Sequence, residues 1–115
     1  MAGTRESRAA LLEPSGRASA LGGAIAVDAA EQDSPSLQRL ELTYEISQTA
    51  SREGDDALAR RAIELALSDA RTVQASDKAQ IASLEMYRAR IARSQGDLAV
   101  AESAVTTANR LFDAI

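Results

Sequence analysis

Hydrophobic residues from about Ser34 to the C-terminus recur at steps of three and four, the spacing that places side chains on one face of an α-helix. The clearest stretch is DDALARRAIELALSDAR, in which Ala and Leu repeat in this way through about Arg71. Gly54 and Gly96 each fall where a helix needs a left-handed residue to end it. The pattern therefore predicts an all-α protein.

The first two helices of this region have recognisable ends. Ser34 is the expected N-cap of the first helix and Pro35 its first residue, because proline tolerates that position. This helix is expected to run to about Glu53. Asp55 and Asp56 then lie where a carboxylate caps the N-terminus of the next helix and meets its positive dipole end.

The last two helices are marked in the same way. Ser76 and Asp77 open the third helix, and Gln80 stands three residues after Asp77 in a capping-box arrangement. This helix is expected to run to about Gln95. Asp97 then starts a fourth helix, which continues to within a few residues of the C-terminus.

Residues 1–33 have a different character. They hold four of the six glycines and one of the two prolines, and they show no sustained helical period. We expect an N-terminal arm, either flexible or docked on the helices, and a helical domain over residues 34–115. If the arm docks, the apolar side chains that cover an otherwise exposed helix are Leu11, Leu12, Leu21, Ile25 and Val27.

Two of the four expected helices look like copies of the other two. An offset of 42 residues aligns a first repeat, about 36–73, with a second, about 78–115. Periods of 20 to 50 residues are typical of helical arrays. The identical pairs are Gln38 with Gln80, Leu42 with Leu84, Ala50 with Ala92, Gly54 with Gly96, Asp55 with Asp97, Ala57 with Ala99, Ala59 with Ala101, Ala62 with Ala104 and Ala66 with Ala108.

The segment GDLAVAESAVTTANRLF resembles the second helix of the tetratricopeptide repeat family, which opens with Gly-Asp and then places small residues at fixed positions. Here these residues are Ala101 and Ala108, while Ala59 and Ala66 follow the first glycine in the same places. The resemblance covers about residues 35–115 and is closest to the long, 42-residue type of repeat. It implies two antiparallel helical hairpins stacked as a short superhelix. A four-helix bundle is the alternative architecture.

The resemblance also implies a binding surface, because the first helix of each hairpin in this family lines a concave groove that receives an extended peptide or a partner helix. Counting back from each glycine gives the groove positions. They are Glu41, Tyr44, Glu45, Gln48 and Arg52 in the first hairpin, and Ser83, Met86, Tyr87, Arg90 and Ser94 in the second.

For the tyrosines and the arginines of these helices, the sequence leaves two roles open. Tyr44 and Tyr87 are either adaptable contacts of the kind that interfaces favour or fillers of an alanine-rich core. Arg88, Arg90 and Arg93 make the third helix locally basic, either as an anion clamp or as a solvated face. Glu41 and Glu45 make the first helix acidic.

Composition narrows the function further. Hydrophobic residues make up 45% of the chain, but alanine dominates them and aromatics are only 3%, which favours helices packed closely together. No Cys or His is present, so thiolate and imidazole chemistry and the metal sites built on them are excluded. The carboxylates fit capping and solvated roles, and neither a calcium loop nor a phosphate-binding glycine loop occurs. We therefore expect no enzyme, no metal and no cofactor.

The net charge of −4 argues against a nucleic-acid partner, which would require a basic face. No stretch approaches the roughly 20 apolar residues of a membrane span, so we expect a cytoplasmic protein without a membrane partner.

Together these observations predict a protein–protein interaction module that acts as a scaffold or as the ligand-sensing part of a regulatory system. The alternatives are a dedicated chaperone or inhibitor of one partner, and a structural protein that self-associates. Two hairpins are fewer than the three or so repeats that usually form a stable solenoid. Leu111, Phe112 and Ile115 leave an apolar end. We therefore expect a homo-oligomer or a part of a longer helical array.

Overall fold

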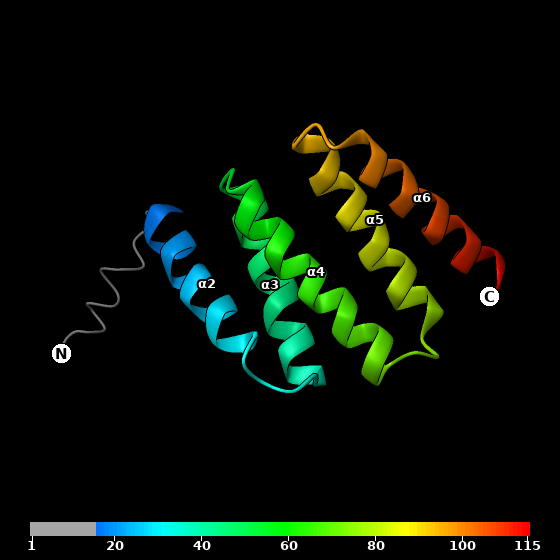
Figure 1. Cartoon of the computed structure of the whole chain (residues 1–115), viewed down its shortest axis with the longest axis horizontal. Helices are drawn as coiled ribbons and strands as arrows, with labels where there is room; N and C mark the ends of the chain where they lie inside the picture. Colours follow the sequence, from blue (N-terminus) through cyan, green and yellow to red (C-terminus); the bar gives the residue numbers. More distant parts are fainter. Residues whose placement is uncertain (1–15) are drawn as a thin grey trace.

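The computed structural model describes the backbone of residues 16–115 and the side chains of residues 22–115. Five helices follow one another in this part of the chain (Figure 1), and it contains no strand. The all-α prediction is therefore confirmed. The helices are α2 (Gly16–Ala30), α3 (Leu37–Arg52), α4 (Asp56–Val73), α5 (Lys78–Ser94) and α6 (Leu98–Asp113).

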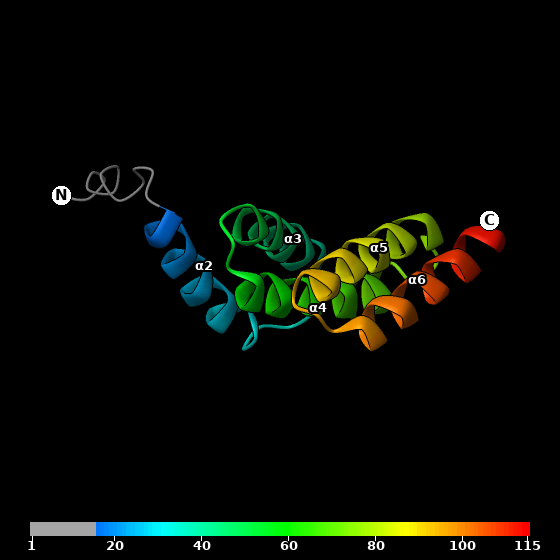
Figure 2. The same ribbon diagram turned by 90° about the horizontal axis from the view of Figure 1, so that it is seen from above.

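The last four helices form two antiparallel hairpins, α3 with α4 and α5 with α6. Helix α4 packs against α5 and so joins the hairpins. Seen from above, α3 and α5 lie in one layer while α4 and α6 lie in the other (Figure 2). Helix α6 packs extensively against α5 but not against α3. The hairpins are therefore stacked side by side and do not close into a four-helix bundle.

The two hairpin turns have the same geometry, as the 42-residue offset requires. Each glycine lies in the left-handed region, with φ of +81° at Gly54 and +78° at Gly96, so the prediction for both is confirmed. The aspartate that follows donates its backbone N–H to an alanine carbonyl of the first helix. Its carboxylate accepts the N–H three residues on and caps the second helix. The equivalent residues are Asp55 and Asp97, Ala50 and Ala92, and Leu58 and Val100.

The predicted start of the first hairpin is wrong by two residues. The N-cap of α3 is Ser36 and not Ser34, and its Oγ accepts the backbone N–H of Arg39 at 3.0 Å. Pro35 therefore precedes the cap and lies outside the helix. The Arg39 guanidinium donates to the backbone carbonyl oxygens of Ala30 and Asp33 and so ties the connection to α3.

The capping box predicted at the start of the second hairpin is half formed. Asp77 caps α5 as predicted and accepts the N–H of Gln80 at 3.0 Å. The reciprocal bond is missing because the N–H of Asp77 already donates to the carbonyl of Gln74. The Oε1 atom of Gln80 is buried without a partner.

Helix α4 runs through the middle of the core and contacts α2, α3 and α5. Small side chains line it, which allows neighbouring helices to approach closely. An alanine buries little area, so at roughly 25 cal/mol per Å² each contributes much less than a leucine. The buried core is formed by Val27, Leu40, Ala50, Leu58, Ala59, Ala62, Ile63, Ala66, Leu67, Ala70, Ile81, Leu84 and Ile91.

Helix α2 precedes the predicted domain boundary at residue 34, yet it packs on α3 and α4 after that boundary. Val27 is fully buried there, whereas Ile25 is 66% exposed. A side chain at Gly23 would begin only 3.1 Å from Leu58 Cδ2 and 3.2 Å from a methyl carbon of α3, so this glycine marks a close approach. Of the two alternatives for the N-terminal arm, residues 16–30 therefore fit the docked one. The side chains of Leu11, Leu12 and Leu21 lie outside the described residues.

A buried ion pair fastens the end of α2 and the two helices of the first hairpin. The Arg39 guanidinium makes two parallel bonds to the Asp69 carboxylate, of 2.7 Å from Nε and 2.5 Å from Nη2. Its Nη1 atom donates to the carbonyls of Ala30 and Asp33. Both side chains of the pair are buried, and the hydrogen bond to Asp69 raises the pKa of Arg39 above its usual value.

The substitution Asp69→Asn should reduce the free energy of unfolding by about 3 to 5 kcal/mol, because it leaves a buried guanidinium without its counter-charge. Denaturant unfolding followed by circular dichroism measures this. Asp28→Asn is the matched control, because its partner Arg61 is exposed, and we expect a loss of about 1 kcal/mol or less. Similar small losses for both variants would contradict the assignment.

Gly22 and Gly23 provide a test of α2 docking. Gly22→Ala should stabilise the protein by about 0.5 to 1 kcal/mol, since alanine favours helix and nothing lies within 4 Å of the new carbon. Gly23→Ala has the same helix preference but forces Leu58 and its neighbour to shift. We therefore expect a smaller gain or a loss. Equal gains in thermal unfolding would mean that α2 is not docked in this way.

Candidate interaction surface

The ten predicted groove residues lie on α3 and α5, the two helices that share one layer (Figure 2). Within each helix they recur at steps of three and four, so each set forms one stripe along its helix. Tyr44, Gln48 and Tyr87 are partly buried, and the other seven are exposed. We call this set the α3–α5 face; it consists of Glu41, Tyr44, Glu45, Gln48, Arg52, Ser83, Met86, Tyr87, Arg90 and Ser94.

An aromatic contact joins the two halves of this face. The rings of Tyr44 and Tyr87 meet edge to face, with their centroids 5.8 Å apart and an interplanar angle of 79°. The guanidinium carbon of Arg90 lies 5.7 Å from the centroid of the Tyr87 ring, which is within the range of a cation–π interaction. Both rings pack against the core and keep part of their surface exposed. The three side chains therefore form one platform between α3 and α5.

Charge is distributed unevenly over the α3–α5 face. Glu41 and Glu45 are exposed on α3, and Arg90 is exposed on α5. Within the described residues none of the three has an ion-pair partner. Arg52 at the end of α3 is also exposed and makes no ion pair among the described residues, so the face offers two carboxylates and two guanidinium groups to a ligand.

The arginines of α5 do not form a single basic patch. Only Arg90 belongs to the α3–α5 face. Arg88 turns towards α4 and binds Glu64 at 2.7 Å and Glu85 at 3.3 Å. Arg93 lines a hollow beside α6. Successive residues of a helix are rotated by about 100°, which separates these side chains.

A chain of alternating charges runs along the junction of α4 with α5 and the start of α6. Arg60 bridges Asp97, at 3.2 Å, and Glu64, at 3.4 Å. The chain continues through the nearly fully buried Glu85, which both Arg71 and Arg88 bind. We call this network the charged seam; in order its members are Asp97, Arg60, Glu64, Arg88, Glu85 and Arg71.

The sequence analysis did not predict the charged seam, although this network links the first hairpin to the second. Its long-range pairs join residues 14 to 37 positions apart, which no local pattern reveals. The two pairs within one helix, Arg60 with Glu64 at i and i+4 and Glu85 with Arg88 at i and i+3, have the spacing that a sequence can reveal.

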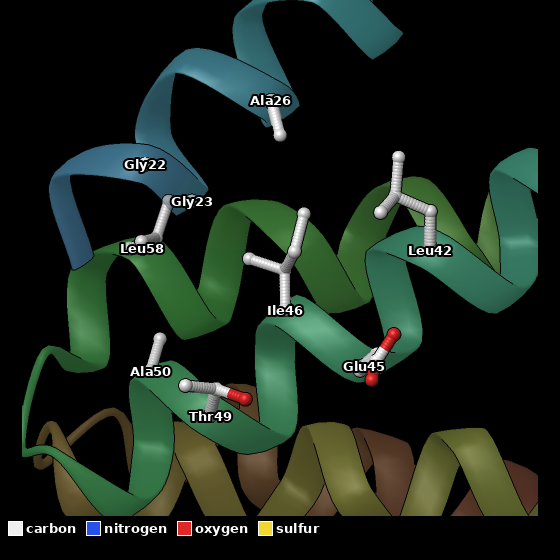
Figure 3. Close-up of a pocket in the computed structure, with 9 residues that line it drawn as sticks. All are labelled: Gly22, Gly23, Ala26, Leu42, Glu45, Ile46, Thr49, Ala50 and Leu58. Atoms are coloured by element: carbon white, nitrogen blue, oxygen red, sulfur yellow. The ribbon is translucent and has the colours of Figure 1, made fainter. Parts of the chain in front are cut away.

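A hollow of about 290 Å³ lies between α2, α3 and α4 (Figure 3). Glu45 is the one residue of the α3–α5 face that lines it. A second hollow, of about 340 Å³, shares Ala26 and Leu42 with the first and continues it along α2. The lining of the first is mostly small or apolar: Gly22, Gly23, Ala26, Leu42, Glu45, Ile46, Thr49, Ala50 and Leu58.

A third hollow, of about 510 Å³, lies at the other end of the stack. It belongs to α6 and the end of α5. Its lining residues are Arg93, Leu98, Ala101, Glu102, Val105 and Thr106.

The described side chains include no group of three or more His, Cys, Asp or Glu that could hold a metal ion. Among the described helices, none combines the length and the apolar character needed to cross a membrane. No family model, curated protein or solved structure matches the chain.

The pKa of Asp97 depends on its contact with the charged seam. The backbone N–H of Val100 and then the Arg60 guanidinium lower the pKa of Asp97 from its usual value. Ionised Asp97 therefore favours the folded state above the unfolded pKa, and this contribution is lost as the pH falls through the lower folded pKa.

The substitution Arg60→Gln should raise the pKa of Asp97 but leave it lower than that of an ordinary aspartate, because the bond from Val100 remains. Carbon-detected NMR titration of the side-chain carboxyl measures this shift. Arg61→Gln serves as the control, since Arg61 binds Asp28 of α2 and Glu31 directly after this helix instead. An unchanged pKa of Asp97 in Arg60→Gln would show that the seam does not reach it.

Proposed function

We propose that the chain is a protein-interaction module of tetratricopeptide-like type, which binds an extended peptide or a partner helix along the α3–α5 face. The observation that carries the proposal is the platform of Tyr44, Tyr87 and Arg90 at the junction of the two first helices. Aromatic and arginine side chains at the centre of a surface are those that most often dominate binding energy. The equivalent turns of the two hairpins support the assignment to this type of repeat.

Binding, and not catalysis, is the activity that these side chains support. The chain has neither His nor Cys, which leaves carboxylates as the main candidates for acid–base chemistry. The two most buried carboxylates, Asp69 and Glu85, are each bound by arginine. The module therefore acts as a scaffold or as the ligand-sensing part of a regulatory system.

The charges of the α3–α5 face define the ligand it would prefer. A basic residue of the ligand complements Glu41 and Glu45, and a carboxylate complements Arg90. Between them, an apolar or aromatic side chain can lie on Tyr44, Tyr87 and the exposed side chain of Met86. The hollow beside Glu45 can take one further small apolar side chain.

The test begins with selection of peptides from a displayed random library against the full chain, followed by titration calorimetry of the best binders. Arg90→Glu should weaken these peptides by about tenfold or more, which corresponds to about 1.4 kcal/mol. Arg93→Glu is the matched control, because it makes the same charge change at an exposed position of the same helix, away from the face. Replacing the ligand carboxylate by lysine should restore binding to Arg90→Glu.

Two outcomes distinguish the scaffold from its rivals. One tight partner that contributes an amphipathic helix indicates a dedicated chaperone or inhibitor, whereas several weak peptides indicate a scaffold. If Arg90→Glu and Tyr87→Ala, both still folded by circular dichroism, retain every selected ligand, the α3–α5 face is not the binding surface.

A further inference from the structure

Helix α2 contains two adjacent glycines, and packing accounts for only one of them. A side chain at Gly23 would begin 3.1 Å from Leu58 and 3.2 Å from Ile46, so its absence lets α2 approach the first hairpin. Gly22 is exposed, its φ is not in the left-handed region, and a side chain there would meet nothing within 4 Å. A glycine inside a helix is less stable than an alanine. Gly22 therefore weakens α2 without improving how it packs.

The space beside Gly22 belongs to the hollow between α2, α3 and α4 (Figure 3). Leu42 and Ile46 point from α3 towards α2, and Ala26 points back from α2. The hollow has a volume of about 290 Å³. An apolar cavity of about 150 Å³ can hold a benzene molecule, so this hollow has room for an aliphatic side chain. A larger residue in place of Gly22 would take up that room.

The wall that α3 contributes to the hollow is a surface that the second hairpin buries. Through the 42-residue offset, Leu42 and Thr49 are equivalent to Leu84 and Ile91 of α5. Leu84 and Ile91 lie in the core with 3% and 2% of their surface exposed, whereas Leu42 is 44% exposed. Helix α2 packs on α3 as α4 packs on α5, but the small residues of α2 leave this wall uncovered. An apolar group in the hollow would cover it.

The unpaired charges along this side of α2 are acidic. Glu45 lines the hollow, and Asp33 lines the second hollow, which continues the first along α2. Within the described residues, neither carboxylate has an ion-pair partner. Arg39 also lines the second hollow, but its charge is balanced by Asp69. A ligand that places a cation next to its apolar group is therefore the best complement.

We infer that the hollow is a side-chain pocket for a partner peptide, which inserts an aliphatic side chain whose neighbour in the peptide is lysine or arginine. The aliphatic side chain lies beside Gly22, against Leu42 and Ile46, and the cation binds Glu45. The inference rests on the proposed function in one respect: Glu45 belongs to both the hollow and the α3–α5 face, so one peptide extends from the face into the hollow. Gly22 is then a specificity-determining residue, which keeps the pocket open.

Peptides selected from a displayed random library against the full chain are the probe. Gly22→Leu places a side chain in the hollow and should weaken the tightest peptides about tenfold or more in titration calorimetry. The same variant should unfold at a higher temperature, because leucine favours helix and its Cβ meets nothing. Weaker binding by a more stable protein separates a blocked pocket from a damaged fold. Ala99→Leu, at an exposed position of α6, is the control and should bind as the unchanged chain does.

A double-mutant cycle shows which peptide side chain occupies the hollow. Replacing the aliphatic residue of the peptide by alanine should cost about tenfold with the unchanged chain but about twofold or less with Gly22→Leu, because that variant has no pocket left to lose. Glu45→Gln should weaken the same peptide about threefold or more. It should leave unchanged the binding of an analogue in which glutamine replaces the basic neighbour.

Equal binding of every selected peptide to the unchanged chain and to Gly22→Leu would overturn the inference. So would another occupant that fills the hollow before any peptide is added. Methyl NMR resonances of Leu42 and Ile46 that shift when Leu11→Glu and Leu12→Glu are combined would assign the hollow to the N-terminal segment. Resonances that shift with protein concentration would assign it to a second copy of the chain.

Arg90→Glu separates this inference from the proposed function, because Arg90 belongs to the platform and does not line the hollow. Peptides that Arg90→Glu weakens and Gly22→Leu does not would bind the α3–α5 face without the hollow, which overturns the inference alone. Peptides that Gly22→Leu weakens and Arg90→Glu does not would support the pocket and contradict the platform as the binding surface.

Discussion

Helix α4 contacts three other helices, and the rest of the structure depends on how closely they can approach it. Alanine at buried positions makes this approach possible, as Ala62 and Ala66 illustrate. The same small side chains bury little apolar area, which limits what the core contributes to stability. Ion pairs supply the geometric definition that alanine lacks. Arg39 with Asp69 ties α2, α3 and α4 together, and the charged seam holds α4 against α5.

Much of the fold could be predicted from the sequence because its signals are local. A glycine, an aspartate and spaced alanines define each hairpin turn and second helix within a few residues. What escaped prediction depends on contacts between distant residues. Ser36 and not Ser34 caps α3, and Arg39 close to this cap binds the carbonyl of Asp33 and the carboxylate of Asp69, which is 30 positions further along the chain. Gly23 reads as a helix breaker in sequence, but it lies inside α2 at a close contact with Leu58.

For the candidate site too, the features that depend on local spacing could be predicted, and those that depend on contacts between helices could not. Counting back from the two glycines placed ten residues along two stripes, of which seven are exposed and three partly buried, because helical periodicity carries a register from the turn into the helix. Periodicity gave no account of Arg88, which binds Glu64 across the junction while Arg90 lies on the face. Nor did it reveal the hollow between α2, α3 and α4, whose walls come from three helices. Contacts between helices, which determine these features, are not encoded in the spacing along one helix.

The charged seam also bears on how the α3–α5 face can work. Tyr44 and Tyr87 come from different hairpins, so their contact survives only if α4 and α5 keep a fixed register. Buried Glu85, bound by Arg71 and Arg88, opposes sliding, because a shifted register would leave a buried charge unpaired. A face that is already ordered loses little conformational freedom when a ligand binds. The two ends of the stack differ, since α2 packs on the first hairpin whereas α5 is the neighbour that α6 has among the described helices. The charged seam therefore fixes the arrangement of the two first helices that a ligand on the α3–α5 face would meet.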